Sequence, residues 1–222
     1  MSTPPYLTQN ETVTVSDIDY QIRSLKNRQQ FCDDQQQADA LGISSASWPL
    51  FGMLWPASRI LAAAVSVMPL TGKRVLEIGC GIALTSIVLH KLGFDITASD
   101  YHPLTKEFLD QNIASNLLPP IQFLTGNWEA ANPLLGKFDV IVGSDVLYEP
   151  AHPGRVSAFI DRHSSHDVKV IIVDPNRGNR TLFTKKMAAL GYLHHFEHFD
   201  TLATGVTGCK GRILHYNRLL AA

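Results

Sequence analysis

A glycine-rich segment, Glu77-Ile78-Gly79-Cys80-Gly81, lies between a predicted strand and a predicted helix. Ligands of open α/β sheets bind beyond the carboxyl ends of the strands, which is where this segment stands. Glycines let a ligand approach the backbone, and the first turn of the following helix offers free N–H groups. Because glycine is also common in ordinary turns, the G-x-G pattern alone fits a binding loop and a structural turn equally well.

Two residues in and beside this loop distinguish the ligands that it could take. A dinucleotide fingerprint needs a small residue three positions after its second glycine, but Leu84 stands there and is too large for close helix–strand packing. Glu77 would repel a pyrophosphate, whereas it would attract a ligand with an amino group or a sulfonium. The loop therefore favours S-adenosylmethionine over NAD, and an NAD-dependent oxidoreductase is the weakest alternative.

Polar and aromatic residues follow the next two predicted strands. Asp100 ends the second strand and can accept hydrogen bonds from ribose hydroxyls, although a plain loop role is the alternative. Tyr101 could place its ring near a nucleoside or simply pack. After the third strand, the Asn127 amide can hydrogen-bond an adenine edge and the Trp128 indole can stack on its face, unless Trp128 is only a core aromatic.

A group of histidines near the C-terminus could bind a metal ion. His194, His195 and His198 lie close to Glu197 and Asp200. However, these residues fall in a predicted strand, where neighbouring side chains point to opposite faces. His194 and His198 share one face, but no third ligand is fixed beside them. Since ligand geometry decides whether a metal binds, we predict no metal site.

The elements that position these residues alternate between strand and helix from residue 73 to residue 191. This alternation predicts an α/β fold with a doubly wound, mostly parallel, seven-stranded Rossmann-like sheet. The last two strands have no helix between them, so we expect an antiparallel C-terminal hairpin. The predicted strands are 73–78, 95–99, 121–124, 138–143, 168–173, 192–199 and 212–216, and the predicted helices are 82–92, 102–116, 155–163 and 181–190.

The N-terminal part of the chain is predicted to cap this core. Residues 1–10 are expected to form a frayed tail, and residues 12–15 and 18–22 alternate as the strands of a hairpin do. A helix is expected from Pro56, because proline suits the first helical turn. These elements are too few for a separate domain. We therefore predict an N-terminal cap over residues 1–70 and a core over residues 71–222.

Composition excludes several other classes of protein. The chain has 222 residues, with 19 Lys and Arg against 20 Asp and Glu, so a broadly basic nucleic-acid-binding surface is not expected. No apolar run approaches the ~20 residues that span a bilayer, and the N-terminus lacks the pattern of a secretory signal. Cys32, Cys80 and Cys209 show no CxxC spacing, which indicates reduced thiols in a cytoplasmic protein.

The motifs taken together resemble those of the class I, seven-β-strand methyltransferases. Within that class, the chain looks like methyltransferase family 16, which includes many protein-lysine methyltransferases. The resemblance covers roughly residues 47–200. The Glu-x-Gly-x-Gly loop is common to the whole superfamily, and the Asp145-x-x-Tyr148 motif after the fourth strand is more specific. The segments that carry the resemblance are Leu54-Trp55-Pro56, residues 75–81, Asp100, Asn127-Trp128 and residues 144–149.

The resemblance implies S-adenosyl-L-methionine as cofactor and S-adenosyl-L-homocysteine as product. It implies that the glycine loop runs along the methionine portion with Glu77 near its amino end, that Asp100 holds the ribose, and that Trp55 closes the cofactor from the N-terminal side. The chain departs from the family at Asn127, where aspartate is common, and at Ala83, where many members have glycine. The residues predicted to bind the cofactor are Trp55, Glu77, Gly79, Cys80, Gly81, Asp100, Tyr101, Asn127, Trp128 and Ser144.

The resemblance also implies a methyl-acceptor channel, faced by Asp145 and Tyr148. Asp145 would bind an incoming ammonium or orient it for proton loss, and Tyr148 would narrow the channel; the alternatives are a cap and a packing residue. A lysine acceptor has to lose its proton, since its free pKa is about 10.4, and a low-dielectric channel lowers that pKa. Segment 174–177, Asp-Pro-Asn-Arg, either edges the acceptor pocket or is only a turn.

We therefore predict an S-adenosylmethionine-dependent methyltransferase that methylates a protein side-chain amine, that of lysine. A small-molecule N-methyltransferase and a non-catalytic S-adenosylmethionine-binding interaction module are the alternatives. A protein substrate is the expected partner, and neither nucleic acid nor a membrane is expected.

Overall fold

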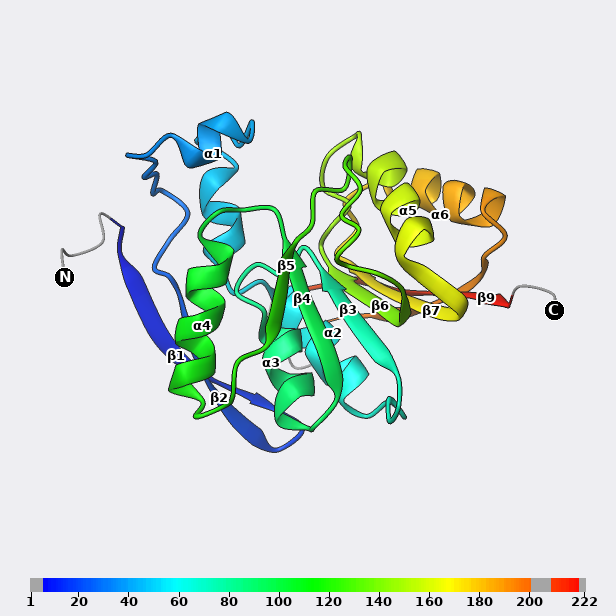
Figure 1. The fold of residues 1–222 in the computed structure, drawn as a ribbon, viewed down its shortest axis with the longest axis horizontal. Helices are drawn as coiled ribbons and strands as arrows, with labels where there is room; N and C mark the ends of the chain where they lie inside the picture. Colours follow the sequence, from blue (N-terminus) through cyan, green and yellow to red (C-terminus); the bar gives the residue numbers. More distant parts are fainter. Residues whose placement is uncertain (1–5, 201–208, 220–222) are drawn as a thin grey trace.

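The computed structural model describes residues 6–200 and 209–219 of the chain. Its centre is a seven-stranded sheet with the strand order β5-β4-β3-β6-β7-β9-β8 (Figure 1). The first five of these strands are parallel, and β9 runs antiparallel to both of its neighbours. The strands are β3 (Arg74–Ile78), β4 (Asp95–Asp100), β5 (Gln122–Thr125), β6 (Phe138–Ser144), β7 (Ser164–Asp174), β8 (Leu193–Phe199) and β9 (Gly211–Leu219).

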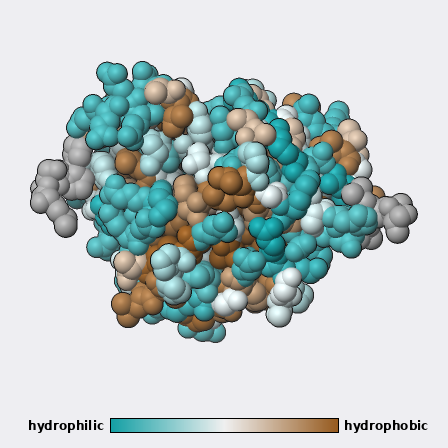
Figure 2. Space-filling model, viewed as in Figure 1, coloured by the Kyte–Doolittle hydropathy of each residue, from teal (hydrophilic) through white to brown (hydrophobic). Residues whose placement is uncertain are grey.

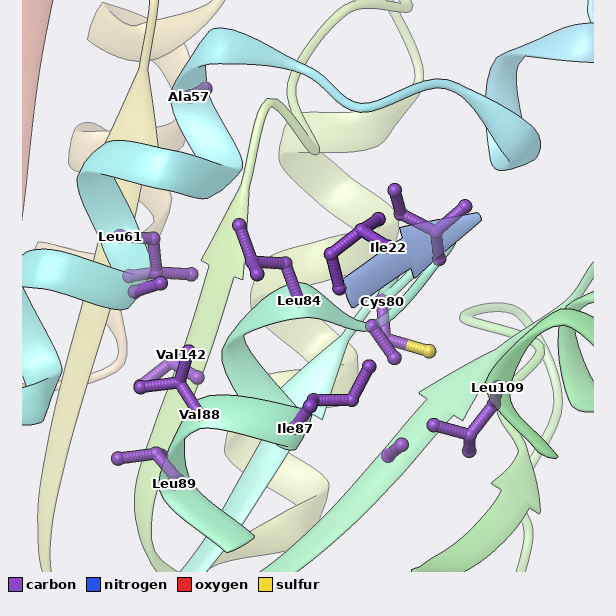
Figure 3. Close-up of a cluster of buried hydrophobic side chains, with 14 of the residues drawn as sticks. Ile22, Ala57, Leu61, Cys80, Leu84, Ile87, Val88, Leu89, Leu109 and Val142 are labelled. Carbon is purple, nitrogen blue, oxygen red and sulfur yellow. The ribbon is translucent and has the colours of Figure 1, made fainter. Parts of the chain in front are cut away.

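Helices cover both faces of this sheet, because successive strand residues alternate between two apolar clusters. On one face, Val75 and Val142 pack with α2 (Pro56–Ser66), α3 (Leu84–Lys91) and α4 (Thr105–Ser115). Figure 3 shows Leu61 of α2 and Val88 of α3 close to Val142. On the other face, Leu76 and Ile141 pack with residues of α5 (His152–His163) and α6 (Arg180–Ala189). The sheet is thus buried between two layers, as the alternation predicts.

The N-terminal hairpin lies against α4 (Figure 1). Strands β1 (Thr8–Val15) and β2 (Ile18–Leu25) pair antiparallel, joined by Ser16 and Asp17 at φ 49° and 61°. These two positive φ angles are those of a type I′ turn, whose twist suits a two-residue hairpin loop.

Two asparagines of α4 hold the outer edge of β2. The Asn116 side chain accepts from the Gln21 N–H at 2.9 Å and donates to the Gln21 carbonyl at 2.8 Å. Asn112 binds the Arg23 N–H and carbonyl in the same way, at 2.7 and 3.2 Å. One helical turn advances about 5.4 Å, close to the advance of two residues along a strand. The two asparagine amides therefore form the hydrogen bonds that a neighbouring strand would form, so these backbone groups of the β2 edge are satisfied.

The site-forming feature of the sheet is the reversal of strand order at β3. The chain passes from β3 to β4 and β5 on one side, and then crosses to β6 and β7 on the other. Parallel sheets leave a crevice at such a reversal, outside the carboxyl ends of the strands. The residues after β3, β4 and β6 therefore meet there. Near this edge also lie α1 (Gln37–Ala40) and the 3-10 helix η1 (Trp48–Gly52), which precede α2.

The predicted α/β fold, its seven-stranded sheet and its C-terminal antiparallel pair are confirmed. Two strands begin four residues earlier than the sequence predicts. Strand β1 begins at Thr8, inside the predicted frayed tail, because β2 supplies its hydrogen-bonding partners. Strand β7 begins at Ser164, four residues early, because Ser164 pairs with Phe138 of β6. Strand β9 lies between β7 and β8, so the hairpin partner β8 forms the sheet edge.

The N-terminal segment and the core share one apolar cluster, which includes Tyr20 and Ile22 of the hairpin as well as Val75 of β3. The boundary at residue 70 stays a prediction. Figure 2 shows hydrophilic residues over α1 and α4, with hydrophobic residues gathered in the middle of the same face. Within the described ranges, no helix combines the length and the apolar content that crossing a bilayer requires.

Candidate functional site

A cavity of about 420 Å³ opens at the carboxyl ends of β3, β4 and β6. Its volume falls within the range of about 300–1,000 Å³ that is usual for small-molecule sites. All but one of the residues predicted to bind cofactor or acceptor line it. These lining residues are Trp55, Gly79, Cys80, Gly81, Asp100, Tyr101, Asn127, Trp128, Ser144, Asp145 and Tyr148.

The glycine loop follows β3 in a conformation that needs glycine at two positions. Gly79 and Gly81 have φ angles of 57° and 54°. A Cβ atom on Gly79 would lie 3.0 Å from Val146 and 3.3 Å from Trp128, and one on Gly81 would lie 2.7 Å from the Phe51 carbonyl oxygen. The turn thus combines left-handed backbone with close approach, and it exposes backbone at the cavity wall.

The Asp100 carboxylate is bound by three backbone N–H groups. Its Oδ2 accepts from Gly81 at 2.9 Å, and its Oδ1 accepts from Tyr101 at 2.7 Å and His102 at 2.8 Å. Burial raises the pKa of Asp100, and these three hydrogen bonds act in the opposite direction. A carboxylate has about four acceptor sites, so capacity remains for a ligand hydroxyl. Asp100 therefore fixes the glycine loop in addition to facing the cavity.

Glu77 is the predicted cofactor residue that does not line the cavity. Its side chain is 1 % exposed, and its Oε2 accepts from the Ser86 N–H at 2.8 Å and the Ser86 hydroxyl at 2.6 Å. Burial raises its pKa to about 7. Through these two hydrogen bonds, the Glu77 carboxyl group connects β3 to α3. It is buried and does not face the cavity. Contact between Glu77 and the amino end of the cofactor stays a prediction that this geometry does not favour.

The residues that follow β4 and β5 use part of their hydrogen-bonding capacity locally. The Tyr101 hydroxyl donates to the Leu41 carbonyl at 2.8 Å, so the ring bridges β4 to the segment after α1. The Asn127 Oδ1 accepts from the Glu129 N–H at 2.9 Å. One lone pair of the amide oxygen is therefore used, so the second lone pair and the amide N–H₂ group remain for a ligand. These contacts restrict both residues to the cavity wall.

Two tryptophans, 73 residues apart in the sequence, border the cavity. Trp55 precedes α2, and its indole donates to the Leu50 carbonyl at 2.9 Å. Trp128 packs edge-to-face on His152, with ring centroids 5.0 Å apart. Both residues line the cavity, and their roles toward a cofactor stay predictions. Cys80 lies on the same wall, and burial raises the pKa of its thiol well above the usual value.

Asp145 follows β6 and forms a bidentate ion pair with Arg177, which follows the neighbouring strand β7. Its backbone is left-handed, with φ 55°, and its N–H donates to the Val173 carbonyl of β7 at 2.8 Å. Arg177 donates through Nε to Oδ1 at 2.8 Å and through Nη2 to Oδ2 at 2.6 Å. The Asp145 side chain is 9 % exposed, whereas that of Arg177 is 41 % exposed. The carboxylate is thus buried, and its cationic partner approaches from the solvent side.

Tyr148 stands at the rim next to this pair. It is 42 % exposed, and its ring packs edge-to-face on His152 at 4.6 Å between centroids. Partial burial raises the pKa of its hydroxyl to about 12, so this group stays protonated and can donate a hydrogen bond at neutral pH. Ser144, the last residue of β6, lines the cavity beside Asp145.

Sequence reasoning missed several residues of the cavity. Phe51 and His102 stack with centroids 3.8 Å apart and planes 11° apart, and burial lowers the pKa of His102 to about 3. The His152 ring packs between those of Trp128 and Tyr148, contacting both. Neither histidine had a signal in the sequence, since each reaches the cavity only through tertiary packing. Arg177 had one, because segment 174–177 follows β7 and was expected either to edge the acceptor pocket or to form a turn.

The C-terminal histidines lie away from this cavity, on β8. The structure brings His195 and Glu197 together with His215 of β9, and their ligand atoms all lie within 4.8 Å of one another. We had considered His194 and His198, which project from the opposite face of β8. Sequence reasoning missed His215 because it lies on a different strand, 20 residues from His195.

Comparisons with known proteins converge on one kind of domain. The family described as "Methyltransferase domain" matches residues 56–204. The magnesium-protoporphyrin O-methyltransferase of Rhodobacter capsulatus is 33 % identical over 118 residues, covering 51 % of each chain. The histone-arginine methyltransferase METTL23 of Rattus norvegicus is 37 % identical over 111 residues, covering 45 % of this chain and 48 % of its own.

A third relative and a solved structure are also methyltransferases. The protein N-lysine methyltransferase METTL21A of Danio rerio is 30 % identical over 140 residues, covering 58 % of this chain and 63 % of its own. These matches span about half to two thirds of the length of the curated relatives. A solved methyltransferase from Pyrococcus furiosus superposes with a TM-score of 0.59 at 18 % identity, covering 85 % of this chain and 100 % of that chain. It shares the fold.

Proposed function

Because this chain belongs to the methyltransferase-domain family, we propose that it transfers a methyl group from S-adenosylmethionine to a side-chain amine of a protein. The family implies S-adenosylmethionine as cofactor and S-adenosylhomocysteine as product. The observation that supports the proposal best is the meeting of Gly79, Asp100 and Asp145 around one cavity. A cofactor wall and a buried carboxylate for an acceptor thereby face the same space.

The residues of the cavity fit this cofactor. Left-handed glycines expose backbone for the methionine portion, Asp100 retains acceptor capacity for ribose hydroxyls, and the Trp128 ring offers an apolar face for the base. When bound, the cofactor supplies an electrophilic methyl group on a sulfonium. The protein's own contribution is therefore alignment of the acceptor and exclusion of water.

The acceptor side is built to receive a cation before the reaction. Asp145 already holds the Arg177 guanidinium at 2.6 and 2.8 Å, which demonstrates that its carboxylate can bind a cationic side chain bidentately. An amine that reaches Asp145 has to displace Arg177, whose side chain is 41 % exposed and can swing toward solvent. Next to Asp145, the Tyr148 hydroxyl can donate a hydrogen bond and its ring narrows the channel.

Lysine is the acceptor that we propose, in the manner of methyltransferase family 16. Relatives that modify proteins are named for lysine, arginine or histidine, which supports a protein side-chain nitrogen as the acceptor. A nucleophilic amine must be neutral. Removal from water lowers the pKa of an ammonium in the cavity, whereas the Asp145 carboxylate raises it, so we propose that Asp145 binds and orients the ammonium and that the proton leaves to water. We also propose a cytoplasmic location, supported by Cys32 and Cys80 being free thiols.

The test uses the purified chain, a cell lysate and a cofactor with a labelled methyl group. We expect label on a protein band, stable to hydrolysis as an N-methyl group is, and strongly reduced in the Asp145→Asn variant. Label in the small-molecule extract would instead indicate a small-molecule acceptor and contradict the proposed protein acceptor. Binding of S-adenosylhomocysteine, measured by calorimetry, is the parallel check: absence of binding would contradict the cofactor assignment itself, and binding without any labelled product would favour the non-catalytic interaction module.

A further inference from the structure

The C-terminal hairpin carries a group of metal-ligating side chains that the proposed methyl transfer does not use. His195 of β8 and His215 of β9 are directly opposite each other in the antiparallel register. Glu197 lies two residues after His195, and alternate residues of a strand share a face. The three side chains therefore project from one face of the sheet at its β8 edge. None of the three is among the described residues that line the cavity.

The geometry of this cluster is compact. The imidazole rings of His195 and His215 lie parallel, with centroids 4.6 Å apart and planes 3° apart. The Glu197 Oε1 lies 3.3 Å from the His215 Nε2. That nitrogen is shielded from solvent and has no hydrogen-bond partner among the described residues, because the carboxylate approaches it outside hydrogen-bonding geometry. A polar atom in this situation lacks the partner that a protein interior normally supplies.

We propose that His195, Glu197 and His215 bind a divalent transition-metal ion, of which Zn²⁺ is the representative. Two imidazoles and one carboxylate are the donor set that suits zinc, copper or nickel, and they do not suit the oxygen-selective Ca²⁺ and Mg²⁺. Three protein ligands leave one tetrahedral position for water.

Small side-chain movements suffice to complete the site. Ligand atoms bound tetrahedrally at about 2.0–2.1 Å lie roughly 3.3 Å apart, and the three ligand atoms here are already within 4.8 Å of one another. His195 and Glu197 are exposed and can rotate, whereas His215 is more buried and fixes one corner. The cross-strand pairing sets the backbone spacing, so binding does not require the sheet to rearrange.

The position of the site suggests what the ion does for the fold. Strand β8 is the edge of the sheet and pairs only with β9 within the described part of the chain, and six of its seven residues are exposed. A metal ion held by both strands would fasten this edge. Binding to the folded chain then stabilises it by mass action, about 2.7 kcal/mol when the free metal is a hundredfold above its dissociation constant.

The experiment uses the full chain without a histidine tag, treated with a chelator and then titrated with ZnCl₂ by calorimetry. We expect one equivalent to bind, a rise in melting temperature, and at least tenfold weaker binding in each of the variants His195→Ala and Glu197→Gln. His194→Ala is the matched control, because His194 lies on the same strand with its side chain on the opposite face. This control should bind zinc as the wild type does.

Substitution with Co²⁺ gives a second readout, since visible absorption bands of tetrahedral cobalt report the coordination directly. These bands should appear in the wild type and in His194→Ala and disappear in His195→Ala. Circular dichroism verifies that each variant is folded. Absence of zinc binding by the wild type, or equal loss of affinity in His194→Ala and His195→Ala, would overturn the proposal. Either result leaves the methyl-transfer proposal untouched, because that proposal rests on the cavity at the carboxyl ends of β3, β4 and β6, which none of the three metal ligands lines.

Discussion

The two walls of the cavity are built in different ways. The wall after β3 and β4 consists mainly of main chain, which hydrogen bonds to Asp100 hold in place. Its glycines stand where a side chain would collide with neighbouring atoms. The wall after β6 and β7 depends on one ion pair between Asp145 and Arg177, two side chains that lie 32 residues apart. The first wall is fixed before a ligand arrives, whereas the second has to exchange partners. The difference fits a cofactor that has the same structure in every turnover and an acceptor side chain that has to displace Arg177.

The largest expected effect is on the fixed wall, from Gly81→Ala. The new Cβ would lie 2.7 Å from the Phe51 carbonyl oxygen on a left-handed backbone. Left-handed strain and overpacking together should lower the free energy of unfolding by about 2–4 kcal/mol and abolish S-adenosylhomocysteine binding. Urea unfolding and calorimetry measure these two effects.

Gly93→Ala is the control for this variant. Gly93 also has a positive φ, 84°, but nothing lies within 4 Å of its added Cβ. It should therefore show the backbone strain alone, about 1–2 kcal/mol, with cofactor binding intact. Equal losses of stability in the two variants would mean that the contact with Phe51 is unimportant.

A second prediction concerns the foundation of the same wall, through the pH dependence of stability. Burial raises the pKa of Glu77 from 4.5 to about 7 in the folded chain. The folded state therefore binds a proton more tightly than the unfolded state, so stability should fall as pH rises from about 4.5 to 7 and level off above it. Between pH 5 and 8 the loss amounts to about 2–3 kcal/mol.

Glu77→Gln removes this titration while its amide oxygen can still accept from Ser86. Between pH 5 and 8, the wild type should therefore lose about 2–3 kcal/mol of unfolding free energy relative to the variant. Chemical denaturation of both proteins at several pH values measures it. Parallel stability curves would show that Glu77 does not titrate in this window.

The exchangeable wall should respond in catalysis and not in cofactor affinity. Asp145→Asn keeps the shape of the side chain and removes its charge. Methyl transfer to the acceptor should fall about 10- to 150-fold, since hydrogen bonds to charged groups contribute about 1.5–3 kcal/mol, with S-adenosylhomocysteine affinity nearly unchanged. Asp100→Ala should give the reverse pattern, with weaker cofactor binding. If both variants lose cofactor affinity alike, the two walls are not independent.

The smallest effect is expected from Arg177→Ala. The loss of a partly exposed ion pair should change the free energy of unfolding by about 0–1 kcal/mol. Because the acceptor no longer has to displace a guanidinium, its apparent affinity should improve, by up to about fivefold, in steady-state kinetics. Arg177→Lys keeps the charge without the bidentate fork and should lie between wild type and alanine. A large fall in activity would instead make Arg177 part of the acceptor-binding surface.

Local patterns in the sequence were sufficient for the fold and for the fixed wall. Strand–helix alternation from residue 73 to residue 191 predicts the doubly wound sheet, because each amphipathic element has few ways to bury its apolar face. The order of strands then brings Gly79, Asp100 and Asp145 to one edge, since the carboxyl ends of parallel strands meet there. A glycine spacing and one acidic residue per strand end are local features, readable without any contact.

Tertiary structure alone decided where individual polar groups point and which distant residues meet. Glu77 belongs to the glycine motif, yet its carboxyl group turns under α3 to Ser86, because the alternation of β3 directs it into the interior. Asp145 finds Arg177, and His195 finds His215, through the pairing of strands that are distant in the chain. Spacing in a sequence fixes which residues are neighbours along one helix or strand. A cross-strand partner depends on strand order and register, which are set only when the whole sheet has formed.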